Sequence, residues 1–480
     1  MNRDYHVIIL GSGPAGFSCA MQSSKFEKKA LIVEANERYL GGSWINTGTV
    51  PSKALRETAN NIFKHATLLG DEDHKKPYER FKMRDVLRYK DSVLASENSE
   101  IKDNIIKNGI DTEIGYGKII DKHTVKITKA NGEEKTYTTD YILISTGTRP
   151  LDPSAFEIDH TTILDNRSIL DLHYIPKRLV IIGTNVQAIE FATIFSALGT
   201  NVSILSREED YLLFLDKELK AEVQSILDSM RVKFFNRVQV KKVGPNPVRN
   251  CTEILFENND DQKLHVIETE QVLYFGARKP NSEKIGLENV QISSNDEGYI
   301  EVDRRYQTNV PNIYAAGDVI GHPGLASVSF SQGRIASCHM FGIPTTEIDS
   351  VIPYGIYSIP EIASIGLTEE EARQQGYKIS IGRSHYKNLT KANIAKNKKG
   401  LLKLVFETET LRLLGVHIVG ESACELIHIG QAVLRYQGDI RYFLDNVHNY
   451  PTYSEAYRIA AFNGVNQVHQ SGITYDKLLS

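Results

Sequence analysis

Short apolar runs beside glycine mark the N-terminal part of this chain. The run Val7 to Leu10 meets glycines at once, and a second apolar run, Ala30 to Val33, ends on Glu34. An apolar run of about four to eight residues bounded by a turn signal is consistent with a strand buried on both faces of a sheet. Residues 5–34 therefore predict a strand, a glycine turn, a helix and a second strand.

The same pattern returns in the middle of the chain. Leu179 to Ile182 predicts a strand, Gly183 starts a turn, a helix follows, and Asn201 to Leu205 predicts the next strand. Two such units are an architectural duplication of an α/β type. After Pro353 the composition changes to strands and long helices, which predicts a C-terminal α+β domain. The informative segments there are Leu401 to Phe406, Leu414 to Val419 and Cys424 to Arg435.

Length and charge narrow the class of protein. A chain of 480 residues predicts roughly three domains, and 41% hydrophobic with 24% charged residues is an ordinary globular composition. A net charge of -4 gives no electrostatic reason to expect nucleic acid or an anionic membrane as partner. The N-terminal apolar run is too short for a signal peptide or a membrane helix. We expect a cytoplasmic protein.

The four cysteines do not form a local site. Cys19, Cys251, Cys338 and Cys424 lie far apart in the sequence and show neither CxxC nor metal-ligand spacing. We expect them to be buried or inert thiols, and we predict no metal site.

The first glycine turn carries the spacing of a dinucleotide-binding site. Gly11, Gly13 and Gly16 form GxGxxG, and Glu34 stands at the tip of the second strand. The glycines allow a tight turn, close approach of the backbone to a pyrophosphate and close packing of helix on strand, while the acid accepts from a ribose. The predicted contacts are Gly11, Gly13, Pro14, Ala15, Gly16 and Glu34.

The second glycine turn departs from this spacing. Gly183 is present, but Asn185 replaces the second glycine and Ala188 the third. Alanine is tolerated at the third position, where only helix packing is affected. Asn185 is the more serious change, because it puts a side chain where the backbone should approach the pyrophosphate.

The tip of the following strand leaves the choice between NAD and NADP open. An acid there would select the free ribose of NAD, whereas Ser206 and Arg207 would suit a 2′-phosphate. Glu208, Glu209 and Asp210 oppose that phosphate. Arg207 as an ordinary surface residue in a mixed-charge loop is an equally good interpretation.

One stretch identifies a family. Residues 41–55, GGSWINTGTVPSKAL, resemble the redox-active segment of the flavoprotein disulfide reductases, the lipoamide dehydrogenase and glutathione reductase family. Two cysteines of that family stand where this chain has Trp44 and Thr49. Further similar segments stand in family order: YILISTGTRP at 141–150, YFGARKPN at 274–281 and NIYAAGD at 312–318. The resemblance implies FAD as cofactor and NAD(P)(H) as substrate.

The resemblance also implies an architecture. It predicts an α/β protein with two Rossmann-like dinucleotide-binding domains and a C-terminal α+β interface domain, through which a homodimer forms. The implied boundaries are 1–150 and 277–347 for the FAD domain, 151–276 for the NAD(P) domain and 348–480 for the interface domain.

The segment NYPTYSEAY near the C-terminus also differs from the dithiol-handling members of the family, as the cysteine positions do. Dithiol-handling members of the family have a His where this chain has Tyr450, whereas Glu455 remains. A tyrosine with a pKa near 10 is a poor general base at neutral pH, and neither Trp44 nor Thr49 can replace a thiolate nucleophile. We expect His448 to be structural. The changes together predict a flavoprotein that gave up dithiol chemistry.

This combination is similar to one branch of the family, the soluble pyridine nucleotide transhydrogenases, from Tyr5 to about Val468. The resemblance implies that one nicotinamide gives hydride to the flavin and another takes it away. It places Lys53 beside the flavin and Glu190 opposite it, as an ion pair between two domains. Two alternatives stay open: an FAD-dependent NAD(P)H oxidase or quinone-type reductase, and a non-catalytic flavin-bound protein whose nicotinamide site has decayed at Asn185.

The resemblance thus gives a full set of expected site residues. The expected catalytic residues are Lys53, Glu190, Thr49, Tyr450 and Glu455. Besides the first glycine turn, the expected FAD contacts are Gly42, Ser43, Thr49, Lys53, Thr146, Gly147, Gly317, Asp318 and Ala326. The expected NAD(P) contacts are Gly183, Asn185, Ala188, Glu190, Ser206, Arg207 and Gly276.

Overall fold

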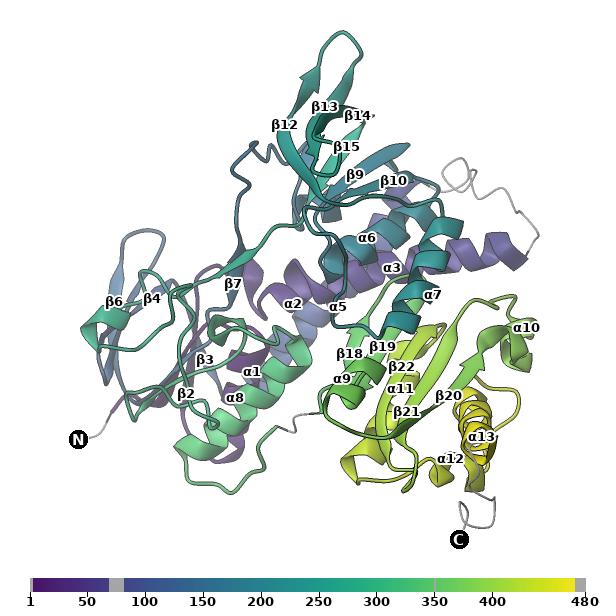
Figure 1. Cartoon of the computed structure of the whole chain (residues 1–480). Coiled ribbons are helices and arrows are strands. Elements are labelled where there is room, and N and C mark those ends of the chain that lie inside the picture. The colour runs from purple at the N-terminus through teal and green to yellow at the C-terminus, as the bar shows by residue number, and fades with distance from the viewer. Residues whose placement is uncertain (1–2, 69–81, 349–350, 471–480) are drawn as a thin grey trace.

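The computed structural model describes residues 3–68, 82–348 and 351–470. Figure 1 shows an N-terminal lobe carrying α1 and α8 on one side, a middle region with the protruding strands β12, β13 and β14 at the top, and a C-terminal region below it. Within the described residues, no helix combines the length and the apolar character needed to cross a membrane.

The N-terminal lobe is built on a sheet in which the described residues contribute seven strands. The order is β3-β2-β1-β6-β5-β4, with β17 also paired to β6. Its strands are β1 (Tyr5–Leu10), β2 (Ala30–Glu34), β3 (Asp111–Ile114), β4 (Tyr116–Asp121), β5 (Thr124–Thr128), β6 (Glu134–Ile144) and β17 (Ile313–Ala315). Its helices are α1 (Pro14–Lys25), α2 (Ser43–Asn46), α3 (Thr49–Leu68), α5 (Met83–Lys107) and α8 (Ala326–Met340).

The predicted first unit is confirmed. The two apolar runs lie inside β1 and β2, which pair in parallel with Val7 opposite Ala30. Both strands are almost completely buried because the sheet is covered on its faces, which explains the continuous rather than alternating apolar pattern.

The middle region contains a second parallel sheet in the order β11-β10-β9-β15-β8. Its strands are β8 (Ile163–Leu164), β9 (Arg178–Ile182), β10 (Asn201–Leu205), β11 (Lys233–Phe235) and β15 (Gln271–Tyr274), with helices α6 (Val186–Ala197) and α7 (Lys217–Ser229). This arrangement confirms the predicted second unit. An antiparallel sheet of β12 (Val238–Asn246), β13 (Cys251–Asn258) and β14 (Lys263–Thr269) extends from it, and the ribbon of β7 (Thr148–Pro150) with β16 (Arg278–Pro280) leads back to the N-terminal lobe.

The C-terminal region is an antiparallel sheet with helices, as predicted. The strand order is β18-β19-β22-β21-β20. The strands are β18 (Tyr354–Ile356), β19 (Glu361–Gly366), β20 (Ile379–His385), β21 (Leu401–Glu407) and β22 (Leu413–Gly420); the helices are α9 (Glu369–Gln374), α10 (Thr390–Ile394), α11 (Ala423–Arg435), α12 (Arg441–Asp445) and α13 (Glu455–Gln470). Together the regions give an α/β fold with two Rossmann-like sheets and a C-terminal α+β domain.

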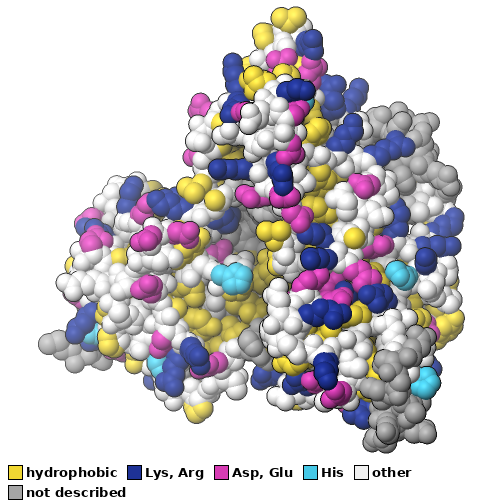
Figure 2. Space-filling view, viewed as in Figure 1, with side chains coloured by type: hydrophobic (Ala, Val, Ile, Leu, Met, Phe, Trp, Pro, Cys, Tyr) yellow, Lys and Arg dark blue, Asp and Glu magenta, His cyan; other side chains and the backbone are white. Residues whose placement is uncertain are grey.

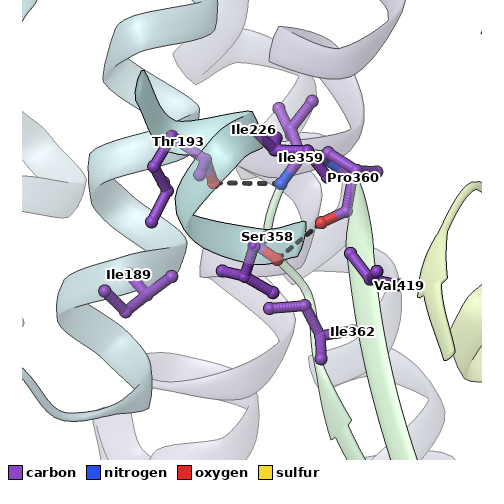
Figure 3. A pocket seen from close by; sticks show the side chains of 10 residues that line it. Ile189, Thr193, Ile226, Ser358, Ile359, Pro360, Ile362 and Val419 are labelled. Atoms are coloured by element: carbon purple, nitrogen blue, oxygen red, sulfur yellow. Dashed lines mark hydrogen bonds between the residues drawn. The ribbon is translucent and has the colours of Figure 1, made fainter. Parts of the chain in front are cut away.

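The middle and C-terminal regions share one hydrophobic core. Buried side chains of α6 and α7 belong to the same cluster as Ile356, Ile359 and Ile362. Figure 3 shows the small apolar cavity at this junction, where the backbone N–H of Ile359 donates to Thr193 Oγ1 at 3.0 Å. The helix that carries Glu190 is therefore fixed against the C-terminal sheet.

Candidate functional site

The turn between β1 and α1 can be made only with glycine. A Cβ on Gly11, whose φ is +101°, would lie 2.4 Å from the carbonyl oxygen of Ser145, and one on Gly16 would lie 2.0 Å from that of Gly11. At Gly13, by contrast, a Cβ would meet nothing within 4 Å. Gly13 is also the N-cap of α1, and no side chain caps that helix end. The first turn of α1 is thus left without an N-cap side chain, as suits a site for a pyrophosphate.

The acid at the tip of β2 is held in place by this turn. Glu34 Oε2 accepts hydrogen bonds from Ser12 N at 3.1 Å and from Ser12 Oγ at 2.5 Å, and its other oxygen accepts from Asn36 N at 3.3 Å. The carboxylate is therefore ordered at the strand tip, beside the glycine turn, where a ribose hydroxyl would need its acceptor.

The segment around α2 closes on the same turn. A Cβ on Gly42 would lie 2.6 Å from Gly13 Cα, so two glycine backbones are in contact there. Ser43, at the start of α2, and Thr49, at the start of α3, are both exposed. Figure 2 shows a hollow between the N-terminal lobe and the rest of the molecule, with apolar side chains on its walls.

The returning segment after β17 adds polar groups to this end of the sheet. Asp318 Oδ2 accepts from Thr148 Oγ1 at 3.3 Å, and Gly317 N donates to Gln332 Oε1 at 2.7 Å. Burial lowers the pKa of the Arg278 guanidinium, and the charge of Asp318 opposes that change. Gly147 has a φ of +67°, and Ala326 begins α8, which packs on α1.

Thr146 has a structural partner. Its hydroxyl donates to the carbonyl of Asn281 at 2.7 Å, and the Asn281 side chain returns a hydrogen bond of 2.9 Å to the Thr146 carbonyl. This pair of hydrogen bonds connects the residues after β6 to the residue that follows β16.

Lys53 and Glu190 form the ion pair that was expected. Lys53 Nζ lies 2.9 Å from Oε1 and 2.8 Å from Oε2 of Glu190, with side chains 26% and 4% exposed. Lys53 is on α3 of the N-terminal lobe and Glu190 is on α6 of the middle region, so the pair bridges the two sheets.

No sequence pattern indicated a role for Tyr357 at this site. Its backbone N–H donates to Glu190 Oε1 at 2.8 Å, and its ring lies under Lys53 Nζ at 4.9 Å from the centroid. A backbone donor leaves no residue-type signal, which is why the sequence pattern did not indicate it.

Asn185 takes a different position from the one expected. Its φ is -69°, a value open to any residue, and its side-chain oxygen accepts from Ala188 N at 3.0 Å as the N-cap of α6. The side chain turns along the helix and satisfies one of the N–H groups that a helix start leaves free. The remaining first-turn donors are not capped by a side chain.

At the end of β10, the two predicted nucleotide contacts Ser206 and Arg207 differ in their exposure to solvent. Ser206 is fully buried, and its hydroxyl donates to the carbonyl of Glu208 at 3.0 Å, so its side chain shapes the loop rather than facing a ribose. Arg207 is exposed, and the structure gives it no hydrogen bond or ion pair among the described residues. The acids behave differently: Glu209 pairs with Arg237 and Asp210 with Lys220.

Gly276, the last expected nucleotide contact, follows β15. A Cβ there would lie 2.3 Å from the Tyr274 hydroxyl oxygen, so a larger residue would have to displace the Tyr274 side chain.

Two family models match this chain. The family described as pyridine nucleotide-disulphide oxidoreductase matches residues 5–333, and its dimerisation domain matches residues 352–461. The chain belongs to this family.

Several relatives resemble the chain over almost its full length. A soluble pyridine nucleotide transhydrogenase of Mycobacterium bovis (strain BCG / Pasteur 1173P2) is 39% identical over 469 residues, covering 97% of this chain and 98% of the relative. One of Pseudomonas aeruginosa (strain LESB58) is 36% identical over 468 residues, covering 97% and 99%.

Solved structures share the fold of this chain. The Cu(II) complex of the HOCl-induced flavoprotein disulfide reductase RclA from Escherichia coli has a TM-score of 0.86 at 23% identity, covering 96% of this chain and 99% of that one. LpdA from Mycobacterium tuberculosis also gives 0.86 at 23% identity, covering 95% and 99%.

The Trp44 side chain packs within the N-terminal lobe. Its ring meets Phe330 of α8 edge to face, with centroids 5.2 Å apart, and packs on the core of the N-terminal lobe. Its Nε1 atom is buried and has no hydrogen-bond partner within the described part of the chain. All four cysteines are unpaired, and three are buried. The described residues contain no cluster of three or more potential metal ligands from His, Cys, Asp or Glu.

The C-terminal candidates lie apart from Lys53 within this chain. Tyr450 is 67% exposed, and its hydroxyl is 2.6 Å from Thr390 Oγ1. Glu455 begins α13, and the described contacts give neither residue a bond to Lys53 or Glu190. Burial, followed by the charge of Arg458, lowers the pKa of His448. Among the described contacts, Lys53 and Glu190 are the two expected catalytic residues that bond directly to each other.

Proposed function

We propose that this protein is an FAD-dependent soluble pyridine nucleotide transhydrogenase that passes hydride between NADPH and NAD without a redox disulfide. The observation that carries the proposal is the Lys53–Glu190 pair, which joins α3 to α6 across the two Rossmann-like units, in a chain with Trp44 and Thr49 where the resemblance expects thiols. The names of the full-length relatives point to the same activity.

The N-terminal turn would hold FAD. The open N-terminus of α1 at Gly13 offers N–H donors to the pyrophosphate, and Glu34 offers a fixed acceptor to a ribose. Gly42, Ser43, Thr49, Gly317, Asp318 and Ala326 border the same end of the sheet. When bound, FAD supplies the group that accepts and returns hydride.

Lys53 and Glu190 form a charge pair where α3 of the N-terminal lobe packs on α6 of the middle region. Because Glu190 is almost completely buried, the ion pair with Lys53 and the hydrogen bond from the N–H of Tyr357 compensate the burial of its carboxylate. The pair keeps α3 and α6 in register, and the Lys53 ammonium provides positive charge on the flavin side.

The second turn would hold the nicotinamide nucleotides, with Arg207 reading a 2′-phosphate. The neighbouring acids Glu209 and Asp210 are already neutralised by Arg237 and Lys220, so Arg207 is left as a cation without a partner among the described residues. A phosphate is a better ligand for such a guanidinium than a neutral ribose.

The domain boundaries and the assembly belong to the same proposal. Residues 1–150 and 277–347 would form the FAD domain, 151–276 the NAD(P) domain and 348–480 the interface domain of a homodimer. The match to a dimerisation domain supports the last point. In a dimer, Tyr450 and Glu455 would be free to face the partner, since Tyr450 is exposed. A cytoplasmic location, expected from the short N-terminal apolar run, is part of the same proposal.

Stopped-flow spectroscopy tests the proposal. Purified flavoprotein mixed anaerobically with NADPH or NADH should lose its flavin absorbance, and added thio-NAD should restore it. Loss of absorbance that only oxygen or a quinone reverses would instead indicate an NAD(P)H oxidase or quinone-type reductase. No loss with either nucleotide would indicate a non-catalytic flavin-bound protein. Lipoamide and glutathione disulfide should not be turned over, because both expected thiols are absent.

A further inference from the structure

A lysine of the C-terminal region is buried beside two carboxylates of the middle region and one of its own region. The Lys403 side chain on β21 is 1% exposed, and Asp216, the residue before α7, is fully buried. Lys403 Nζ donates to both oxygens of Asp216 at 2.9 Å and to Glu369 Oε2 at 2.8 Å, and lies 3.2 Å from Glu218 Oε2. A buried charge is costly unless it is paired and hydrogen bonded, so this cluster allows little freedom to either region.

The cluster holds the first turn of α7. Asp216 is the N-cap of that helix and accepts from Glu218 N at 3.0 Å and Leu219 N at 3.3 Å. Arg383 on β20 donates to Glu218 Oε1 at 2.6 Å. Two cations of the C-terminal sheet thus fix the helix start of the nucleotide unit from outside it.

The same helix holds the loop that carries Arg207. Residues 206–216 connect β10 to α7, and in that loop Asp210 pairs with Lys220 of α7. Tyr211, Leu212 and Leu215 are buried in the core that α7 shares with the C-terminal sheet. The other end of the loop is held separately, since Arg237 N donates to the Glu208 carbonyl at 3.1 Å. Arg207 directly precedes Glu208 at the β10 end of this loop, and α7 holds the loop from Asp210 onward.

We propose that Lys403 is a positioning residue for nucleotide recognition: by holding Asp216 and the start of α7, it fixes the loop that presents Arg207 to a 2′-phosphate. This inference rests on the proposed function, because it takes residues 178–210 as the nicotinamide nucleotide site. It assigns to the C-terminal region a part in choosing between NADP and NAD, although Lys403 itself does not touch the nucleotide.

Calorimetric titration of the FAD-loaded protein with 2′,5′-ADP and with 5′-AMP tests the proposal directly. These probes carry the adenosine end with and without the 2′-phosphate. In Lys403→Met we expect the affinity for 2′,5′-ADP to fall about tenfold, and that for 5′-AMP to change by less than about twofold, as for coupling through a packed network. Lys403→Arg should recover most of the loss. Lys90→Met removes another buried lysine, on α5, and should leave both affinities unchanged.

If Lys403→Met does not fold, Asp216→Asn tests the same proposal. Asparagine caps a helix as well as aspartate, so this variant removes the charge that Lys403 holds and retains α7. We expect the same selective loss for 2′,5′-ADP. Combining either variant with Asp210→Asn should add less than the sum of the two single losses, because both act through one loop.

The outcomes separate the two proposals. Wild-type protein that binds neither probe would overturn nucleotide binding at this site and the inference with it. Wild-type binding together with an unchanged ratio of the two affinities in both variants would overturn the role of Lys403 and leave the proposed function standing. An equal loss for both probes would also count against it, because that is the effect of general destabilisation.

Discussion

Lys53 and Glu190 come from two different sheets, and a third part of the chain completes their contact. Lys53 Nζ is 2.8 Å from Glu190 Oε2, while the backbone N–H of Tyr357 donates to Oε1 at 2.8 Å. The carboxylate is therefore held by α3 of the N-terminal lobe and by the C-terminal region at once. Its position depends on all three regions being docked.

Removing Lys53 should lower the free energy of unfolding more than neutralising Glu190 does. Lys53→Met leaves a buried carboxylate with only the Tyr357 N–H, and we expect about 3 kcal/mol of lost stability, at the lower end for a broken buried pair because Lys53 is a quarter exposed. Glu190→Gln keeps a side-chain acceptor for both donors and should cost about 1 kcal/mol. Urea unfolding of the two variants measures the difference. Equal midpoints would show that the pair is not desolvated as the structure indicates.

Replacing Asn185 by glycine should strengthen the binding of nicotinamide nucleotides. Asn185→Gly removes an N-cap side chain, which should cost only a few tenths of a kcal/mol, and releases the N–H of Ala188 to the pyrophosphate, so nicotinamide nucleotides should bind more tightly. Asn185→Asp keeps the cap but adds negative charge, and binding should weaken. Fluorescence titration with NADH and NADPH measures both. Weaker binding by Asn185→Gly would mean that the amide contacts the nucleotide.

The glycine turns show what the sequence could predict. Gly11 and Gly16 are required by contacts of 2.4 and 2.0 Å, and such constraints leave a local spacing that can be recognised. The Lys53–Glu190 pair was expected from a resemblance and not from local pattern, because its partners are far apart in the chain.

Other features depend on tertiary contacts that have no local signal. Asn185 was expected to obstruct the site, yet its side chain caps α6, a rotamer choice that residue type alone does not fix. The sequence showed three acids opposing Arg207, but Arg237 and Lys220 neutralise two of them. Lys403 lies in an unremarkable apolar strand, and only the docked structure places Asp216 beside it.

Arg237 should matter for the same specificity as Arg207. Arg207→Ala removes the expected phosphate ligand, so the Kd for NADPH should rise about tenfold or more while that for NADH changes little. Arg237→Ala frees Glu209 from its ion pair and should weaken NADPH binding in the same direction by a smaller factor. Adding Glu209→Gln to Arg237→Ala should reverse that smaller loss. Equal NADPH and NADH effects would exclude a 2′-phosphate contact.

His417 should make stability depend on pH. It is fully buried between Ser364 Oγ at 2.6 Å and the Leu367 carbonyl at 3.0 Å, and burial lowers its pKa from 6.5. Below pH 6.5 the unfolded chain binds a proton that the folded chain refuses, so stability falls as pH falls, by up to about 1.4 kcal/mol per pH unit. Urea midpoints at several pH values measure this slope. His417→Gln should flatten it, and the exposed His428→Gln should not.

Trp44 is the only tryptophan of the chain, which makes its surroundings directly measurable. Because its Nε1 atom is buried and its ring rests against Phe330, tryptophan emission should be blue-shifted and poorly quenched by iodide. Trp44→Ala should open the side where the family's thiols would stand and let small quinones oxidise the reduced flavin. Trp44→Phe keeps an aromatic contact with Phe330 and should retain most of the restriction. An acceptor range that stays the same in Trp44→Ala would show that the indole fills the core without guarding the flavin.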